Sequence, residues 1–362
     1  MLKNTEIWIG NYLKQTLQRQ PRSNKNTTPT HIFFCFVDHF EPHWNKADVS
    51  LQLERVRAWV EKYPQLADKH KDADGYSPRH TFFYPAEVYT KEHLELLAQI
   101  CHRGYGEVEV HLHHDNDTAP SLKEKLEKAK MDFARHGLLG KDKSGEIRYG
   151  FIHGNWALNN SRKDGKWCGV NNESQILKET GCYADFTLPS APSETQTRMI
   201  NSLYYDQGSK EKPKSHDTGI NVKAGKTMDG LMIIQGPLTF NWKRRKYGII
   251  PKIENSDISS GHLPSDDRVD LWVEQRISVE GKPDWIFIKV HTHGAVEKNT
   301  AVLLGDPMDK MCSYLETRYN DGRNFVLHYV TARELYNIIK AAETNQEESP
   351  AKYRDFLIQW PN

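Results

Sequence analysis

The chain has 362 residues, of which 37% are hydrophobic and 27% are charged, so it contains enough apolar material for a large hydrophobic core. Its 49 lysines and arginines nearly balance its 48 aspartates and glutamates, which gives no indication of nucleic acid or an acidic polymer as a partner. The five cysteines include no C-x-x-C pair, and this spacing predicts neither a disulfide framework nor a thiolate zinc site.

The N-terminal segment predicts an amphipathic helix over residues 5–20, followed by a polar linker over 20–30. The apolar residues of its buried face are Trp8, Ile9, Tyr12, Leu13 and Leu17. Such a helix either docks on the domain or lies on a membrane surface as a peripheral anchor, and the sequence leaves both open. The start of the chain lacks the apolar run of a signal peptide, and no stretch is long enough to span a bilayer, so we expect a cytoplasmic protein.

From residue 31 onward, short apolar runs alternate with helical patterns. The predicted strands are 31–37, 81–84, 107–113, 149–153, 183–188, 231–235, 285–291 and 325–330. The predicted helices are 50–62, 90–102, 121–136, 171–180, 194–203, 266–276, 308–318 and 332–342. Because parallel strands need crossover helices, this alternation predicts a parallel sheet. Seven or eight such units predict an α/β fold, a distorted TIM-like (β/α)7–8 barrel over residues 30–347. Residues 1–29 precede it as helix and linker, and 348–362 follow it as a tail.

Two polar stretches interrupt this pattern, at residues 206–229 and 236–264. Both lie beside late strands, so we expect long loops over the mouth of the barrel. The second contains Lys243, Arg244, Arg245 and Lys246. These cations form a solvated charged face or bind the phosphates of a carrier or nucleotide.

Catalytic side chains of a (β/α) barrel lie at the carboxyl ends of its strands. The candidates at these ends are Asp38, His39, Glu41, His111, His113, His114, Asp115, Asp117, His153, Asn155, Trp156, Asp185, His291, His293 and His328. Alternate residues of a strand share one face, so His111 and His113 can point at one ion, as can His291 and His293. Imidazole and carboxylate ligands suit Zn²⁺ or a similar divalent metal, with Co²⁺, Ni²⁺ and Mn²⁺ as alternatives. His328 by itself is typical of a core or surface histidine.

The order of these residues resembles the polysaccharide deacetylase superfamily, in a divergent branch associated with bacterial surface polysaccharides. The resemblance covers most of residues 31–330 and rests on FCFVDHFEP (34–42), EVEVHLHHD (107–115), HGNWALNNS (153–161), GCYADFTLPSAP (181–192) and VHTHG (290–294). It implies a distorted (β/α) barrel that uses a divalent metal to remove N- or O-acetyl groups from sugars.

The resemblance also implies roles for individual residues. Asp38 matches the general base, and His39 stands where the family has a second acid that binds the metal, unless Glu41 takes that place. His111 matches a metal ligand whose partner is Asp115 or, alternatively, His113. Asp185 matches a supporting acid, and His291, with His293 beside it, matches the general acid. The family's third motif supplies an arginine that is absent here, so we expect His153 or Asn155 to substitute; Glu41, His153, Asn155 and Trp156 are the expected substrate contacts.

The expected function is deacetylation of a sugar, a sugar nucleotide or a lipid-linked glycan during bacterial polysaccharide biosynthesis. A metallophosphoesterase or amidohydrolase on a similar barrel would use the same ligand types. A glycoside hydrolase would need two suitably spaced carboxylates rather than a histidine cluster. The altered acid pair and the missing arginine also keep a non-catalytic, glycan-binding scaffold as an alternative.

Overall fold

The computed structural model describes residues 3–18 and 28–361, so most of the linker expected at 20–30 lies outside the described residues. The helices are α1 (Ile9–Gln18), α2 (Val49–Ala67), α3 (Lys91–His102), α4 (Ala119–Ala134), α5 (Glu173–Glu179), α6 (Asp266–Glu274), α7 (Glu297–Leu303), α8 (Asp306–Tyr319) and α9 (Ala332–Glu343). Short 3-10 helices are η1 (Thr5–Ile7), η2 (Trp44–Lys46), η3 (Ala86–Val88), η4 (Leu158–Asn160), η5 (Ser215–Asp217) and η6 (Pro350–Tyr353). None of the described helices is both long and apolar enough to cross a membrane.

The strands are β1 (Thr30–His39), β2 (His80–Pro85), β3 (Gly106–Leu112), β4 (Lys141–Asp142), β5 (Tyr149–His153), β6 (Cys182–Asp185), β7 (Leu203–Asp206), β8 (Gly219–Asn221), β9 (Met232–Ile234), β10 (Thr239–Lys246), β11 (Ile250–Glu254), β12 (Trp285–Thr292), β13 (Phe325–Val330) and β14 (Ile358–Gln359). The central sheet has the order β12-β1-β2-β3-β5-β6-β9-β7-β8, with β13 also paired to β1. Its pairs are parallel except β7–β9 and β7–β8. The predicted α/β class and largely parallel sheet are therefore confirmed.

The closed barrel is not confirmed, because no ladder joins β8 to β12 in the described part of the chain. The segment 277–280 lies between these two strands and makes only isolated contacts. Glu280 N donates to Val222 O at 2.9 Å, and Phe287 N donates to Ile277 O at 2.8 Å. The late strands β7, β8 and β9 have four residues or fewer, and β7 runs antiparallel, so they do not extend the regular parallel pairing around to β12.

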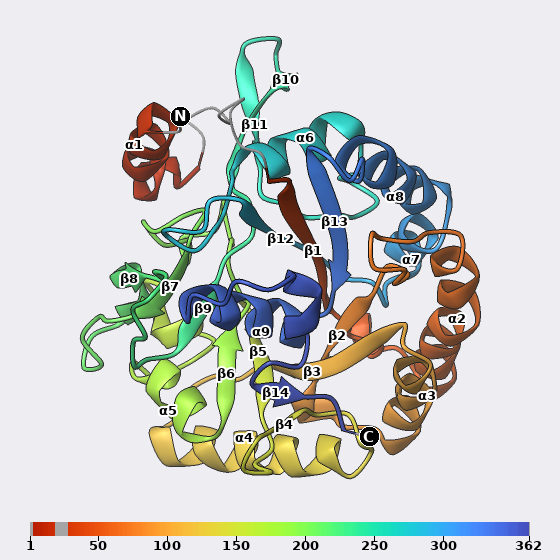
Figure 1. Cartoon of the computed structure of the whole chain (residues 1–362). Coiled ribbons are helices and arrows are strands. Elements are labelled where there is room, and N and C mark those ends of the chain that lie inside the picture. The colour runs from red at the N-terminus through yellow and green to blue at the C-terminus, as the bar shows by residue number, and fades with distance from the viewer. Residues whose placement is uncertain (1–2, 19–27, 362) are drawn as a thin grey trace.

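The strands surround α9, with the other large helices outside them (Figure 1). Alternation along β1 explains this two-sided core. Phe33 and Cys35 belong to an inner apolar cluster with residues of α9, whereas Phe34 and Phe36 pack in an outer cluster with residues of α2, α6 and α8. Both faces are buried, which is why the strand is an almost continuous apolar run.

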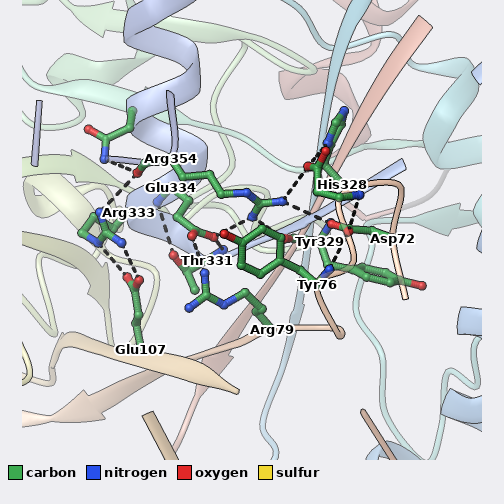
Figure 2. Close-up of polar contacts among 12 residues, drawn as sticks. Asp72, Tyr76, Arg79, Glu107, His328, Tyr329, Thr331, Arg333, Glu334 and Arg354 are labelled. Atoms are coloured by element: carbon green, nitrogen blue, oxygen red, sulfur yellow. Dashed lines mark hydrogen bonds and ion pairs between the residues drawn. The ribbon is translucent and has the colours of Figure 1, made fainter. Parts of the chain in front are cut away.

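A buried ionic network joins the first turn of α9 to the C-terminal segment (Figure 2). Arg333 donates to both oxygens of Glu107 on β3, at 3.1 and 2.7 Å. Glu334 accepts from Arg79 and, at 3.1 Å, from Arg354. Arg354 also lies 3.2 Å from Asp72. The expected C-terminal tail is thus anchored to the sheet, and β14 pairs with β4.

Several expected elements differ in the structure. The helix expected at 194–203 is wrong: the segment is irregular and runs into β7, and Gln196 Oε1 accepts from the backbone of Ser190 and Ala191 instead. The expected loop at 206–229 contains η5 and β8, and the one at 236–264 contains the β10–β11 hairpin. The helix at the N-terminus is present and docked through buried Trp8, but Leu13 and Leu17 of its predicted buried face are 53% and 86% exposed.

Candidate metal centre

Four side chains converge on the inner side of the sheet, at the carboxyl ends of β1 and β3. His39 is the last residue of β1 and Glu41 follows it, while His111 lies near the end of β3. His39, Glu41 and His111 can each place a ligand atom within 4.8 Å of the others. His113, two residues beyond His111, brings Nε2 to 3.0 Å from Glu41 Oε1. We call His39, Glu41, His111 and His113 the inner cluster.

The hydrogen bonds of two rings fix which nitrogen faces the cluster. His111 Nδ1 lies 3.1 Å from the carbonyl oxygen of Ile152, and His113 Nδ1 lies 2.6 Å from Glu87 Oε1. Both partners are acceptors, so each Nδ1 can keep its proton when Nε2 loses one, which would leave an Nε2 lone pair facing the cluster. The two Nε2 atoms lie 3.1 and 3.0 Å from the same oxygen of Glu41. Metal-binding histidines use this arrangement, with the outer nitrogen donating to a carbonyl or carboxylate.

The ionisation of these rings agrees with a site for a cation. Burial opposes a charge on His113, but its hydrogen bonds to Glu41 and Glu87 outweigh burial and raise its pKa to about 9. Burial lowers the pKa of His111 despite the hydrogen bond to Glu41. A metal ion at His113 Nε2 would have to displace the proton that Glu41 and Glu87 favour there.

Two atoms of the inner cluster remain unsatisfied. His39 Nδ1 and Glu41 Oε2 are buried and have no hydrogen-bond partner within the described ranges 3–18 and 28–361. Burial, then the neighbouring His293 and His111, hold the pKa of His39 well below its usual range. The His39 ring stacks on His293, with centroids 4.6 Å apart. A bound ion is one way to satisfy such atoms, and an ordered water is another.

A cleft of about 480 Å³ adjoins the inner cluster. Its lining includes Asn155, Trp156, Arg162, Trp167, Pro189, Ser190, Pro192, Ser193, Asn255, Asp257, Ser259, His291 and His293. Burial lowers the pKa of His291 to about 3, against the effect of Asp257. Burial would raise the pKa of Asp257, but hydrogen bonding to His262 and the nearby His291 lower it to about 2. At neutral pH this wall presents a neutral imidazole beside a carboxylate.

Asp38, the expected general base, lies on the opposite face of β1 from His39. Its side chain is fully buried. Oδ1 accepts from Gly294 N at 2.6 Å, and Oδ2 lies 2.8 Å from His80 Nε2. A Cβ on residue 294 would lie 2.1 Å from Asp38 Oδ2, so the position requires glycine. Asp38 thus holds the backbone next to His293 and does not face the cleft.

A second group of metal-ligand types lies outside the sheet. It consists of His114, His153, Cys168 and Glu173, all buried, and we call it the outer cluster. His153 Nδ1 accepts from the backbone N–H groups of Asn155 and Ala157 at 3.2 and 3.3 Å. The proton of the neutral ring is therefore on Nε2, the atom that faces Glu173 at 3.9 Å. This arrangement leaves His153 without a lone pair for a metal, so the expected substrate contact at this residue is not in the cleft either.

Two other predicted residues lie apart from the inner cluster. Asp185, expected as a supporting acid, accepts from Thr187 Oγ1 at 2.7 Å, and burial raises its pKa to about 7. The same Thr187 oxygen accepts from His153 N at 2.9 Å. Asp185 therefore helps to position His153 of the outer cluster through Thr187. Asp115, expected as a metal ligand, accepts from Trp167 N at 2.6 Å and so holds a loop of the cleft.

The structure also adds residues that the sequence did not indicate. Glu87 lies just after β2. No candidate was identified from the sequence at the end of this strand. Asp257 and Trp167 come from segments between regular elements, where no periodic pattern marks them. Comparison of the sequence with protein-family models and with curated proteins gives no match. The function is therefore inferred from the two clusters and the cleft.

Proposed function

We propose that this chain is a metal-dependent hydrolase that removes an acetyl group from a sugar or glycan. The observation that carries the proposal is the meeting of His111 Nε2 and His113 Nε2 at Glu41 Oε1, at 3.1 and 3.0 Å, next to His39. Three imidazoles and a carboxylate form a ligand set that suits Zn²⁺, with Co²⁺, Ni²⁺ or Mn²⁺ as alternatives. An ion bound there would polarise an acyl oxygen and lower the pKa of water.

His291 is the residue best placed to move protons in the cleft. Its ring is neutral at pH 7, and its Nδ1 is buried with no hydrogen-bond partner in the described part of the chain; the lowered pKa makes it a weak base whose protonated form is a strong acid toward the leaving group. It would accept the proton of the attacking water and then return it to the departing amine or alkoxide. Asp257 would stabilise the imidazolium formed between these steps. In this proposal His291 takes the base role expected for Asp38 and keeps the acid role expected for itself.

The cleft walls favour an uncharged, carbohydrate-like substrate. Trp156 and Trp167 offer ring faces against which the C–H groups of a sugar can pack, and Asn155 and Asn255 offer amide groups for hydroxyl or acetamido contacts. Arg162, the cation of the lining, is already paired with Asp164 at 2.8 and 2.7 Å. With Asp257 ionised nearby, the cleft is poorly suited to the phosphate of a phosphoester.

Acetate release from N- and O-acetylated sugars tests the proposal. Protein purified without chelator should release acetate, lose activity after chelation, and regain it when Zn²⁺, Co²⁺, Ni²⁺ or Mn²⁺ is returned. Release of phosphate from phosphate esters with no acetate release would instead identify a phosphoesterase. Stoichiometric metal with no turnover of any acetylated sugar would favour the non-catalytic scaffold.

A further inference from the structure

The β10–β11 hairpin projects from the edge of the molecule, next to α1 (Figure 1). Residues 242–250 are exposed except Arg244, which is half-buried. Four large apolar side chains lie in this run: Trp242, Tyr247, Ile249 and Ile250 are 56%, 80%, 77% and 40% exposed. Apolar residues of this size gathered at one exposed tip commonly mark an interaction site.

The same segment carries a uniform positive charge. Residues 239–253 contain Lys243, Arg244, Arg245, Lys246 and Lys252 and no aspartate or glutamate, in a chain whose overall formal charge is +1. Among the described residues, Arg244 is the only one of the five that forms an ion pair, with Asp267. The other four charges remain available to a partner.

The backbone conformation of the turn at the tip is unfavourable for one of its residues, Tyr247. Tyr247 and Gly248 have φ values of +54° and +71°, and Ile249 N donates to Lys246 O at 3.3 Å. A turn with two positive φ values favours Asn-Gly, and a bulky side chain is disfavoured at its first position. Tyr247 is largely solvated, so folded-state packing does not compensate for this conformation.

The base of the hairpin is held firmly, which fixes the position of the tip. Phe240 stacks on Trp8 at 4.9 Å and packs edge-on against Tyr12 at 5.0 Å. Asn241 Oδ1 accepts from the backbone of Lys243 and Arg244, both at 3.0 Å. A two-stranded hairpin alone is marginally stable, and these contacts supply the support that it lacks.

We propose that the tip of this hairpin docks the protein on an anionic phospholipid surface. Tryptophan and tyrosine favour the bilayer interface, isoleucine favours its apolar boundary, and unpaired lysines and arginines are attracted to acidic headgroups. Charges and rings alternate at the tip: the Arg245 guanidinium lies 5.9 Å from the Trp242 ring, and the Lys246 ammonium lies 5.1 Å from the Tyr247 ring. An acidic protein partner would match the charge but would not require apolar side chains dispersed among the cations.

Docking here would also place the cleft near the membrane. β11 ends at Glu254, and Asn255 and Asp257 directly after it line the cleft. Delivery of a lipid-linked glycan to that cleft is a consequence that rests on the proposed function. Membrane binding itself does not, and it is measured without a substrate.

Cosedimentation of the full chain with vesicles tests the docking. We expect binding to vesicles of phosphatidylcholine with phosphatidylglycerol, weakened by salt, and little binding to phosphatidylcholine alone. Each lysine or arginine near an anionic surface strengthens binding about fivefold. The variant Lys243→Gln/Arg245→Gln/Lys246→Gln/Lys252→Gln should therefore bind at least about a hundredfold more weakly. The control Lys62→Gln/Lys91→Gln/Lys298→Gln/Lys310→Gln loses the same charge from exposed helix positions and should lose far less affinity.

A second variant tests the apolar part without weakening the turn. Asparagine tolerates positive φ, so Tyr247→Asn combined with Ile249→Ser should keep the hairpin folded and lower vesicle binding about tenfold or more. Acetate release from a soluble sugar should be unchanged in both hairpin variants. Absence of binding to anionic vesicles would overturn the proposal, as would equal binding to neutral vesicles or equal losses in the hairpin and control variants.

Discussion

The inner and outer clusters contain nearly the same side chains but hold them in opposite ways. In each, two histidines meet a buried glutamate. In the inner cluster, Nδ1 of His111 and of His113 faces an acceptor, so both Nε2 atoms, which point to Glu41, can give up a proton to bind a metal. In the outer cluster, His153 Nδ1 accepts two backbone N–H groups, so its Nε2 carries a proton. The two clusters therefore differ in the hydrogen-bond partner of Nδ1, the ring nitrogen that points away from the glutamate. This partner, rather than the residue types, distinguishes a metal centre from a structural hydrogen-bond network.

The two clusters also lie on different faces of the sheet. His39 and His111 point toward the inner side, whereas His153 points outward toward α5, where Glu173 is the first residue. Glu173 ties these segments together, accepting from Asn159 N at 2.7 Å and contacting His114 Nε2 at 3.1 Å. Of the two clusters, the inner one lies next to the cleft, because His39 stacks on His293, which lines it.

Removing the two inner histidines should give the largest effect. His111→Ala combined with His113→Ala leaves Glu41 and His39 without the lone pairs that complete the site. We expect metal content to fall from near one ion per chain to near zero, and kcat/KM for acetate release to fall by about a thousandfold or more. Elemental analysis and acetate release measure the two quantities.

The matched control is His102→Ala, an exposed histidine of α3 that should retain both metal and activity. Full metal content in the double variant would place the ion elsewhere, with the outer cluster and the group of Asp72, Asp74 and His328 as the remaining candidates. That result would contradict the inference that the hydrogen bonds at Nδ1 identify the metal-binding cluster.

Glu173→Gln should instead damage stability and spare the metal. Burial opposes protonation of His114, but Glu173 and Asp117 outweigh burial and raise its pKa, so the substitution removes the main charged partner of a buried ring. Breaking such a pair costs about 3 kcal/mol or more in the free energy of unfolding, measurable by urea denaturation. Glu179→Gln, an exposed position on the same helix, should leave this free energy nearly unchanged. A Glu173→Gln protein that is stable but lacks metal would reverse the assignment of the two clusters.

The same carboxylate gives the outer cluster a distinct response to acid. Burial alone would raise the pKa of Glu173, but His153, His114 and the N–H of Asn159 lower it to about 2. Because this folded pKa lies below the unfolded value of about 4.5, its stabilisation is complete above pH 4.5 and is lost as the pH falls toward 2. This contribution amounts to at most about 3 kcal/mol, because His153 is uncharged above about pH 3 and then adds no attraction. The free energy of unfolding of the native chain should therefore fall more steeply between pH 4.5 and 2 than that of Glu173→Gln. Parallel slopes would show that Glu173 is not the titrating group.

Strand ends could be predicted from the sequence because apolar runs and their polar boundaries mark them directly. His39, Glu41, His111 and His113 were identified in this way, and the structure brings them together. The face of each strand end was harder to assign, because one residue of offset turns a side chain to the other side of the sheet. Asp38 and His153 were expected at the site because they lie at strand ends and match the resemblance, but both point to the other face of the sheet. Asp257 and Trp167 follow irregular segments whose paths depend on tertiary contacts, which no local pattern encodes.

Asp38→Asn tests the face assignment directly. The buried carboxylate accepts from Gly294 N and contacts His80, so an amide would place an N–H group against one of them. We expect a loss of about 1–3 kcal/mol in the free energy of unfolding and less than about a tenfold fall in kcat. A general base at this position predicts the reverse: unchanged unfolding and loss of most activity. Urea denaturation together with kcat separates the two roles.

The smallest expected effect concerns substrate contact in the cleft. Trp167 is 41% exposed, its N–H is fixed by Asp115, and the Arg162 guanidinium covers its ring at 4.1 Å. If a sugar ring packs beside it, Trp167→Ala should raise KM about fivefold, which corresponds to about 1 kcal/mol, while kcat stays constant. Trp167→Phe keeps an aromatic face and should recover most of this loss. A fall in kcat at constant KM would mean that Trp167 supports the inner cluster and does not contact the substrate. The main evidence that the cleft binds a sugar would then be gone.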